Sequence, residues 1–341
     1  MTLSSLNKCV ISNSAYFLPT QRVSSIELFD AFNSEQQYGL ANDWMIKEMG
    51  IHERRMAPRY MKPSDLAIAA AEIVIKDLST IELDEIDMVI FCGIERDQPE
   101  PATAHRIQLK LGLKAGFCFD VANACFGFID GVSMASKFIE SGAARRALVV
   151  TGEVPTRISE KTVEKLSTGV AQKDMHKMIG ALSVGDAGGA MLLSASSPTE
   201  RRGFVSFFNQ TESQHRKKCY YKHEENGDID VCMDMARIVA RGFRISQGMI
   251  ETTLSKLGWT TFDWSFAHQT GRRTYEQCES LKGVRPNTII KTYPYLGNIT
   301  TATFPVTYAI GEEKQLMNQG DRIGGGFVGS GIAAGQFGYV Y

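Results

Sequence analysis

Short apolar runs alternate with amphipathic segments along most of this chain. Apolar, β-rich runs occupy 88–92, 147–151 and 190–193, and segments with a helical spacing of apolar residues occupy 64–78, 126–141 and 232–257. Strands that alternate with helices are typical of α/β proteins, in which helices cover the sheets. We therefore expect an α/β fold with buried sheets.

The pattern of the first half recurs in the second half. A helical segment leads through Asp87 to a strand in the first half, and another leads through Asp263 to a strand in the second. The spacing from Asp87 to Asp263 nearly equals that from Cys125 to Asn298. Two copies of one unit explain this agreement. We expect the halves to span 1–197 and 198–341, with Cys125 and Asn298 in equivalent strand-to-helix turns.

Two polar segments interrupt the pattern. The segment 157–179 is rich in Lys and Glu, and we interpret it as an excursion near the mouth of a site or at a dimer contact. The segment 213–228 is charged throughout and is expected to form a loop.

Cys125 stands where a strand at 117–121 gives way to a helical segment. Amides and the dipole at a helix N-terminus stabilise a thiolate, and a thiolate can attack an acyl thioester. The competing interpretation is a buried, inert thiol. That interpretation is favoured for the remaining cysteines, which are Cys9, Cys92, Cys118, Cys219, Cys232 and Cys278.

Composition narrows the classes of function. A net charge of −1 over 341 residues argues against a generic nucleic-acid binder. The cysteines form no CxxC pair and no HExxH motif is present, so we expect no metal site. No apolar run has the length of a membrane span, and no signal-like segment opens the chain. The cytoplasm, with free thiols, is therefore the expected location.

Six ordered motifs resemble those of the β-ketoacyl-ACP synthase III branch of the thiolase superfamily. They are GIHERR at 50–55, DVANACFGF at 120–128, GDAGGA at 185–190, FAHQ at 266–269, GNITTA at 297–302 and GGGFVGSG at 324–331. The resemblance runs along nearly the whole chain. It implies a thiolase fold, with duplicated α/β halves in a five-layered αβαβα arrangement, and a homodimer.

The resemblance also implies roles for Cys125, His268 and Asn298. Cys125 carries the acyl group, while His268 and Asn298 face it from the other half and donate hydrogen bonds to the thioester oxygen of the second substrate. The amide of Cys125, with one from the glycine segment around Gly326, holds the oxygen of the acyl group. Read from the residues alone, Asn298 also fits a turn and His268 a core histidine.

Glu100 marks a departure from the decarboxylating members, which usually carry an apolar or aromatic residue at this place. The sequence EPATA at 100–104 resembles instead the enzymes that condense two acyl thioesters head to head in olefin, pyrone and dialkylresorcinol pathways. In that subgroup the glutamate reaches into the partner subunit and removes a proton from the α-carbon. A condensation without decarboxylation needs such a base. The alternative is a glutamate that supports a helix start, with Pro101 at the first helical position.

Substrate binding is expected at Trp44, Arg273, Gly326 and Phe327. Trp44 matches the family's adenine-stacking tryptophan, although Glu48 stands where the family often has arginine. A basic patch for an acyl carrier protein is one interpretation of five arginines, and an ordinary solvated face is the other. These are Arg237, Arg241, Arg244, Arg272 and Arg273.

The sequence therefore predicts a ketosynthase that joins a Cys125-bound acyl group to a second acyl, or β-ketoacyl, thioester without decarboxylation. The partners expected are acyl-CoA or acyl carrier protein thioesters, with no cofactor, nucleic acid or membrane. The alternatives are a decarboxylative synthase that uses a malonyl thioester, an acyltransferase to oxygen or nitrogen, and a non-catalytic subunit of a condensing complex. Phe126, Phe128 and Met134 are candidates to line the acyl tunnel, with an ordinary place in the core as the alternative for each.

Overall fold

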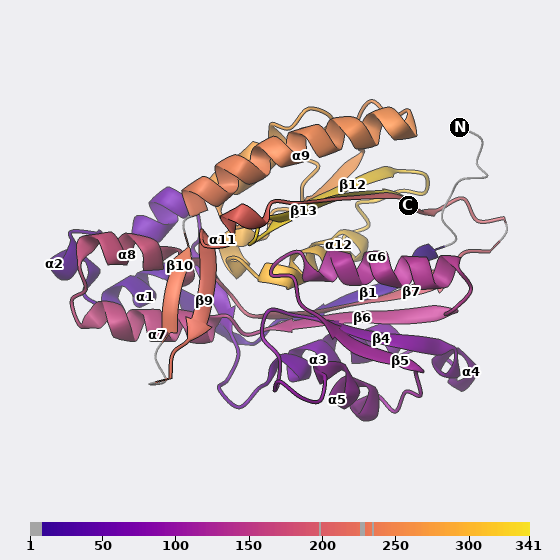
Figure 1. Ribbon diagram of the computed structural model, residues 1–341, viewed down its shortest axis with the longest axis horizontal. Coiled ribbons are helices and arrows are strands. Elements are labelled where there is room, and N and C mark those ends of the chain that lie inside the picture. The colour runs from indigo at the N-terminus through magenta and orange to yellow at the C-terminus, as the bar shows by residue number, and fades with distance from the viewer. Residues whose placement is uncertain (1–8, 198, 226–228, 234) are drawn as a thin grey trace.

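Two sheets lie on either side of a central pair of helices (Figure 1). The computed structural model describes residues 9–197, 199–225, 229–233 and 235–341. The first sheet has the order β1 (Cys9–Phe17), β7 (Ala187–Ala195), β6 (Arg146–Glu153), β4 (Ile86–Cys92) and β5 (Phe117–Val121). The second has the order β11 (Trp264–Ala267), β12 (Arg322–Gly329), β13 (Ala333–Val340) and β8 (Gly203–Thr211).

Helices complete five layers. The central helices are α6 (Gly127–Glu140) and α12 (Thr303–Glu313). The outer face of the first sheet carries α3 (Pro63–Ile75) and α5 (Thr103–Lys110), and that of the second carries α9 (Met235–Leu257), with α10 (Arg272–Glu279) packed against α9. This arrangement confirms the predicted α/β class and five-layered thiolase architecture.

The two sheets share one strand order. Read from the antiparallel edge, β1-β7-β6-β4 corresponds to β8-β13-β12-β11, and the β4–β6 and β11–β12 pairs are both parallel. The first sheet continues with β5, whereas the second continues with a single parallel bridge between Ser265 and Ile289. The repeat in the sequence therefore appears as a repeat in topology.

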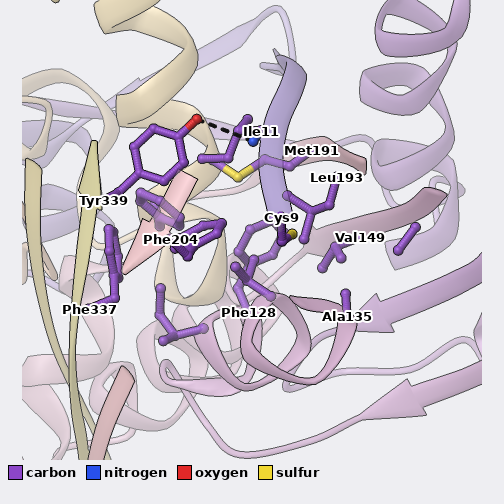
Figure 2. Close-up of a cluster of buried hydrophobic side chains, with 14 of the residues drawn as sticks. Cys9, Ile11, Phe128, Ala135, Val149, Met191, Leu193, Phe204, Phe337 and Tyr339 are labelled. Carbon is purple, nitrogen blue, oxygen red and sulfur yellow. Dashed lines mark hydrogen bonds between the residues drawn. The ribbon is translucent and has the colours of Figure 1, made fainter. Parts of the chain in front are cut away.

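A shared aromatic core joins the sheets (Figure 2). Phe128 of α6 and Met191 of β7 are buried in the same cluster as Phe204 of β8 and Phe337 of β13. The amide of Ile11 donates to the hydroxyl of Tyr339 across the layers, with an N–O distance of 3.3 Å. Burying each large apolar side chain contributes about 1.5–3 kcal/mol, so this cluster is a main source of stability.

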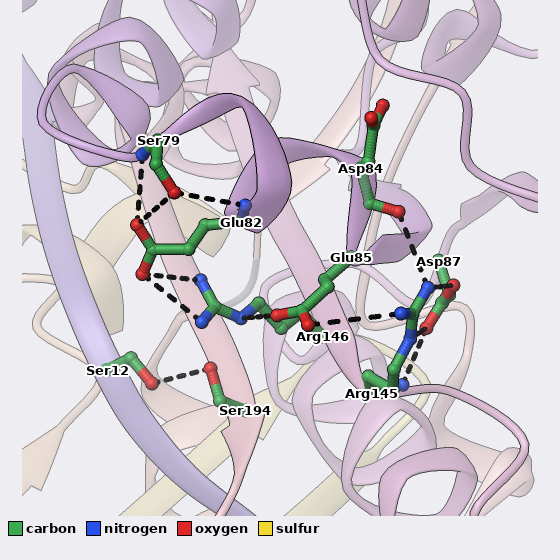
Figure 3. Close-up of polar contacts among 9 residues, drawn as sticks. All are labelled: Ser12, Ser79, Glu82, Asp84, Glu85, Asp87, Arg145, Arg146 and Ser194. Carbon is green, nitrogen blue, oxygen red and sulfur yellow. Dashed lines mark hydrogen bonds and ion pairs between the residues drawn. The ribbon is translucent and has the colours of Figure 1, made fainter.

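An aspartate binds an arginine at the base of each sheet. In the first half Asp87 accepts bonds from the amide, Nε and Nη2 of Arg145, at 2.7, 3.1 and 2.9 Å (Figure 3). In the second half Asp263 accepts the same three bonds from Arg322, at 2.9, 2.9 and 3.1 Å. The paired aspartates in the sequence thus mark one repeated clamp. It ties the start of β4 to the start of β6 in the first sheet, and the start of β11 to the start of β12 in the second.

The remaining elements gather at the end of the sheets where β4 and β5 finish, except α4, which precedes β4 at the opposite end. They are α1 (Ser25–Ala31), α2 (Ser34–Tyr38), a π-helical turn (Met45–Met49), α4 (Thr80–Asp84), α7 (Thr156–Ser167), α8 (Gln172–Met178), α11 (Tyr293–Leu296), the pair β2 (Gln21–Ser24) and β3 (Glu53–Met56), and the hairpin β9 (Cys219–His223) and β10 (Ile229–Met233). Short 3-10 turns occupy Ile179–Ser183, Ser213–His215 and Thr300–Ala302.

The structure corrects two expectations about these segments. The expected loop at 213–228 contains β9, although 226–228 lie outside the described residues. The helix expected from Cys232 begins at Met235, because Cys232 belongs to β10. None of the helices within the described ranges has the length and apolar character needed to cross a bilayer.

Candidate active site

Cys125, His268 and Asn298 line one cavity of about 340 Å³. Cys125 lies in the turn between β5 and α6, His268 directly follows β11, and Asn298 precedes the 3-10 turn that leads into α12. The two sheets thus bring a thiol from the first half to an imidazole and a carboxamide from the second. The cavity is lined mainly by apolar side chains, as a pocket for an acyl chain requires.

The turn that carries Cys125 is tight and strained. Ala124 has a φ of 47°, in the left-handed region that residues with a Cβ rarely adopt. The amide of Phe126 donates to the carbonyl of Asn123 at 3.1 Å, and α6 begins at Gly127. A Cβ on Gly329 would meet the Phe126 amide at 3.1 Å, so a glycine there lets β12 approach the turn. This geometry presents Cys125 to the cavity at the start of a helix.

The thiol is nevertheless not a resting thiolate. Cys125 is partly accessible through the cavity, yet protein surrounds it, and this burial raises the pKa of its thiol well above the usual range. The negative charge on Glu153 adds to that rise, while a backbone amide opposes it only weakly. The expectation of a thiolate stabilised by the helix is therefore wrong for the free protein, and Cys125 needs a base.

His268, which lines the same cavity, has the tautomer and the neutral charge that such a base requires. Thr303 donates its hydroxyl proton to the carbonyl of Thr300 at 2.9 Å, so it can only accept from His268 Nδ1, which lies 3.2 Å away. This assigns the proton to Nδ1 and leaves a lone pair on Nε2. Burial lowers the pKa of His268 to about 4, so the ring is neutral at pH 7. The sequence analysis expects His268 to donate a hydrogen bond. In the free protein its Nε2 can only accept one, and it becomes a donor once it takes a proton.

Asn298 is oriented by its own turn. Its backbone N–H donates to the carbonyl of Ser183 at 2.9 Å, and its side-chain Oδ1 accepts a hydrogen bond from the backbone N–H of Thr300 at 3.0 Å. Because Oδ1 is occupied, Nδ2 is the polar end left to donate to a substrate oxygen. Gly297 precedes it at a φ of 66°. A Cβ there would lie 2.5 Å from the Ser183 carbonyl, so the turn requires glycine.

Glu100 lies on the loop between β4 and α5, exposed to solvent, and it does not belong to the lining of the Cys125 cavity. It also plays no part in starting α5, which begins at Thr103 after the cap residue Ala102. Asp120 accepts the amides of Thr103 and Ala104 at 2.8 and 2.9 Å instead. The alternative interpretation, with Pro101 at the first helical position, is therefore wrong, and helix support does not explain Glu100.

A second cavity of about 680 Å³ meets the first at Met233, Val239, Thr270 and Thr274, which line both. Trp44 and Arg273, which the sequence analysis predicts to bind substrate, both line this second cavity. Trp44 stacks on Phe29, with ring centroids 5.9 Å apart. The wall also carries Lys177, Lys217 and Lys218 beside Glu48. The two cavities together lead from a basic surface to the nucleophile.

The other residues predicted for the site lie either on the wall of the cavity or in the hydrophobic core. Gly326 lines the cavity, whereas Phe327 is 2% exposed and packs in the central core. Phe126 and Phe128 are core residues, as the alternative interpretation had it, and Met134 is exposed, so none of the three lines the cavity. The cavity extends along α9 and α10 instead, through Ile238, Val239, Gly242, Phe243, Cys278 and Leu281.

The arginines considered for a basic patch do not lie together. Arg272 and Arg273 lie on the second cavity, and Arg272 donates to the carbonyls of Lys47 and Ile46 at 3.0 and 3.2 Å. Arg241 and Arg244 lie on a separate groove, where Arg241 pairs with Glu212. The side chain of Arg237 lies outside the described residues. Across the part of the chain that the structure describes, no three His, Cys, Asp or Glu side chains gather as metal ligands do.

Besides the residues of α9 and α10, the sequence analysis also missed lining residues on β6 and β9. Cys219 and Tyr221 reach it from β9, and Glu153 reaches it from the end of β6. Tyr221 donates its hydroxyl to Glu95, which lies on the same wall. Of these residues only Glu153 could have been found in the sequence, because a charged residue at the end of an apolar strand is unusual.

Comparisons with known proteins agree with this geometry. Residues 119–213 match the family model of 3-oxoacyl-[acyl-carrier-protein] synthase III. An acyl-CoA:acyl-CoA alkyltransferase of Xanthomonas campestris is 29% identical, over 86% of this chain and 87% of its own length. One from Shewanella oneidensis is 27% identical over 96% and 97%. A β-ketoacyl-[acyl-carrier-protein] synthase III of Rhizobium rhizogenes is 28% identical over 86% and 90%.

Solved structures give the same result. Xanthomonas OleA with bound cerulenin superposes with a TM-score of 0.91 at 25% identity, over 100% of this chain and 99% of that one. A cysteine-to-serine variant of OleA with bound lauric acid and lauroyl-CoA superposes with a TM-score of 0.90 at 25% identity, over 98% and 100%. Other OleA structures carry substitutions of a glutamate and a histidine.

Proposed function

We propose that this chain, a β-ketoacyl-ACP synthase III-like condensing enzyme of the thiolase superfamily, joins two acyl thioesters head to head without loss of carbon dioxide. The observation that carries the proposal is the meeting of Cys125, His268 and Asn298 in one apolar cavity. The glutamate, cysteine and histidine substituted in OleA follow one another in the same order and at nearly the same spacing as Glu100, Cys125 and His268.

The first step loads Cys125. His268 Nε2 takes the thiol proton, the thiolate sulfur attacks the carbonyl of the first acyl thioester, and the carrier's carbon–sulfur bond breaks. The proton on His268 then passes to the departing carrier thiolate, so the ring is neutral again. The amide of Cys125 is the proposed donor to the oxygen on which charge develops.

The second step forms the carbon–carbon bond. A base removes a proton from the α-carbon of the second thioester, and the carbanion attacks the carbonyl of the acyl group on Cys125. The Cys125 thiolate leaves and regains a proton. Asn298 Nδ2 is the proposed donor to the enolate oxygen, which carries the charge in the transition state, and His268 can join it only once Nε2 carries a proton.

Glu100 of the partner subunit is the proposed base. The exposed loop of Glu100 lies beside a sheet edge suited to pairing, because β5 ends the first sheet with Phe117 38% exposed. Leu109 on α5 and Met134 on α6 are 79% and 39% exposed near the same edge. A dimer through this edge would bury those apolar groups and carry Glu100 toward the other cavity.

Mixed dimers test the proposal for Glu100. Glu100→Gln and Cys125→Ala are each expected to lower condensation by at least about 100-fold, since each removes one group of the reaction. Co-expression of the two variants should restore activity, because a mixed dimer has one site with both groups. Failure of the mixture, with dimers present by mass photometry, would contradict action across the interface.

The second cavity is proposed to bind the carrier. Trp44 offers a ring for the adenine of coenzyme A, and Arg273 with Lys217 and Lys218 offers charge for its phosphates or for an acidic carrier protein. The shared residues Thr270 and Thr274 lead from there toward Cys125.

A decarboxylative synthase is the second candidate, favoured by relatives named β-ketoacyl-[acyl-carrier-protein] synthase III. Two acyl-CoAs of different length, supplied with and without malonyl-CoA, separate the candidates. We expect crossed products without malonyl-CoA and no carbon dioxide. Product that requires malonyl-CoA and releases carbon dioxide would overturn the head-to-head proposal.

The cytoplasm is the proposed location, because all seven cysteines are free thiols, as reducing compartments favour. The domain boundary is proposed between 197 and 198, in the connection from β7 to β8.

A further inference from the structure

Glu100 lies at the midpoint of a short loop whose two ends are joined. The amide of Asp97 donates to Oγ1 of Thr103 at 3.2 Å, and Glu100 is three residues from each of them. The side chains between these ends are exposed, whereas those of Asp97 and Thr103 are buried. Pro99 and Pro101 flank Glu100, and a proline ring fixes φ at about −65°, so the tip has little conformational freedom. The loop is a closed projection with a carboxyl group at its tip.

Asp97 binds one end of this loop to α3. Its Oδ1 accepts the amide of Ser64 at 3.0 Å, and its Oδ2 accepts the hydroxyl of Ser64 at 2.6 Å. Arg106 of α5 lies 3.5 Å from the same Oδ2 and also pairs with Asp65 at 2.6 Å. The positive end of the α3 dipole favours the negative charge of Asp97, whose side chain is only 4% exposed. Both carboxylate oxygens are therefore held by the first turn of a helix.

Thr103 binds the other end of the loop to the strand that leads to Cys125. Its backbone N–H donates to Oδ2 of Asp120 at 2.8 Å, and that of Ala104 donates to Oδ1 at 2.9 Å. Asp120 belongs to β5, which is the edge strand of the first sheet. The Thr103 hydroxyl is thereby fixed where it accepts the Asp97 amide. One end of the loop is held by α3 and the other by β5, at the edge where the dimer is proposed to form.

The Glu100 carboxylate has no support of its own. Within the described ranges it makes no hydrogen bond or ion pair, and it does not line the cavity of its own subunit. Its position therefore depends on the loop that carries it. A base must lie within hydrogen-bond reach of the proton that it removes, and an error of about 1 Å can lower a rate by about 100-fold.

We propose that Asp97 and Thr103 are positioning residues, which hold the loop so that Glu100 of one subunit reaches the substrate's α-carbon in the cavity of its partner. The inference rests on the proposed role of Glu100 as the base. The other role that these contacts could serve is stabilisation of α3 and α5 alone. The two roles differ in where a substitution acts. A weakened fold matters in either subunit, whereas positioning matters only in the subunit that supplies Glu100.

Mixed dimers with one complete site separate these roles. In a dimer of the Cys125→Ala chain with the Glu100→Gln chain, the complete site takes its thiol from the second chain and its base from the first. Asp97→Asn is added to one chain at a time, and crossed product from paired acyl-CoAs is measured. On the Cys125→Ala chain it should lower condensation by about 10- to 100-fold, because that chain supplies Glu100. On the Glu100→Gln chain it should change the rate by less than about threefold, since the tip of that loop carries no base.

Thr103 and Asp65 provide the second variant and the matched control. Thr103→Val removes the acceptor of the Asp97 amide and should lower condensation about tenfold, while Thr103→Ser, which keeps the hydroxyl, should restore it. Asp65→Asn removes the same charge from a carboxylate that also pairs with Arg106 but lies outside the loop, so condensation should stay within about threefold. Acyl loading of Cys125, measured by intact mass, should be unchanged in all these variants, because loading needs no α-carbon base.

The outcomes distinguish this inference from the proposed function. Equal losses whichever chain carries Asp97→Asn would show that Asp97 only supports the fold, and would overturn its positioning role. An unchanged rate in both placements would overturn it as well. A parent dimer of Cys125→Ala with Glu100→Gln that is itself inactive would instead contradict the action of Glu100 across the interface, and the role of Asp97 would fall with it.

Discussion

The two halves of this molecule share a scaffold and differ at its working end. Both use an aspartate–arginine clamp at the base of parallel strands, Asp87 with Arg145 and Asp263 with Arg322. Both place a residue of positive φ immediately before the functional side chain, at 47° for Ala124 and 66° for Gly297. The shared features are therefore the clamp at the start of the strands and the turn that orients the functional side chain.

The differences decide what each half supplies. The first half ends its sheet with a full strand, β5, and aims a thiol from it, whereas the second half has only the Ser265–Ile289 bridge at that place. β6 ends with Glu153, while the matching strand β12 ends with Gly329, which packs against the Cys125 turn. In the proposed mechanism the first half therefore carries the covalent chemistry, and the second half supplies the hydrogen-bonding groups His268 and Asn298.

The largest expected effect separates covalent loading from condensation. Cys125→Ser should abolish both the acyl-enzyme and the product. Asn298→Ala should still form the acyl-enzyme but lower condensation by about 100- to 1,000-fold, because it removes one donor to the developing charge. Intact mass and product formation in a single turnover measure the two steps. Equal loss of both steps in Asn298→Ala would contradict the division between the halves.

Substitution in the two strained turns should affect the free energy of unfolding to very different extents. Gly297→Ala is expected to lower the free energy of unfolding by about 3–5 kcal/mol, because it adds backbone strain and a contact of 2.5 Å with the Ser183 carbonyl. Ala124→Gly should change it by less than about 1 kcal/mol, since glycine adopts the same φ freely. Urea unfolding measures both. A similar loss in the two variants would show that the turns are not comparable.

The buried acid and the buried base should have opposite pH dependences. Burial raises the pKa of Glu153 to about 7, so ionisation in the unfolded chain destabilises the fold as pH rises from about 4 to 7. Burial lowers the pKa of His268 to about 4, so stability is lost as pH falls from about 6.5 to 4. Glu153→Gln should therefore stabilise by about 2–3 kcal/mol at pH 8 and by little at pH 4, as measured by urea unfolding at the two pH values.

The smallest effects belong to the clamps. Asp263→Asn and Asp87→Asn should each lower the free energy of unfolding by about 1 kcal/mol, as expected for partly exposed ion pairs. The loss for Asp263 should be the larger, because Arg285 also donates to it at 2.7 Å and its side chain is 19% exposed against 28% for Asp87. Arginine bonding lowers the pKa of both carboxyls, so the differences from the unsubstituted protein should fade as pH falls below about 4.

The features that can be predicted from the sequence are those that depend on short motifs. The strand-to-helix turns at Cys125 and Asn298, and the paired Asp87 and Asp263, depend on short motifs with fixed spacing, so both the duplicated fold and the meeting of the three groups are readable. Strand alternation also forbids that Gly326 and Phe327 face the same side, and the prediction for Phe327 overlooked this rule.

Other features depend on packing between distant segments. The face that α9 turns to the cavity is set by β12 and β13 beneath it, and the role of the 219–233 hairpin is set by its contact with Glu95. The protonated state of Cys125 results from burial that outweighs the helix amides, a balance that exists only in the folded chain. These features could not be predicted from the sequence alone.

A pulse-chase on Cys125 tests the central claim most directly. The protein is loaded with one acyl-CoA, freed of excess reagent, and mixed with a second acyl-CoA of different length in the absence of malonyl-CoA. The account predicts that the acyl mass on Cys125 disappears at the rate at which crossed product forms, with no carbon dioxide released. An acyl group that stays on Cys125 until malonyl-CoA is added, or that never forms, would contradict it.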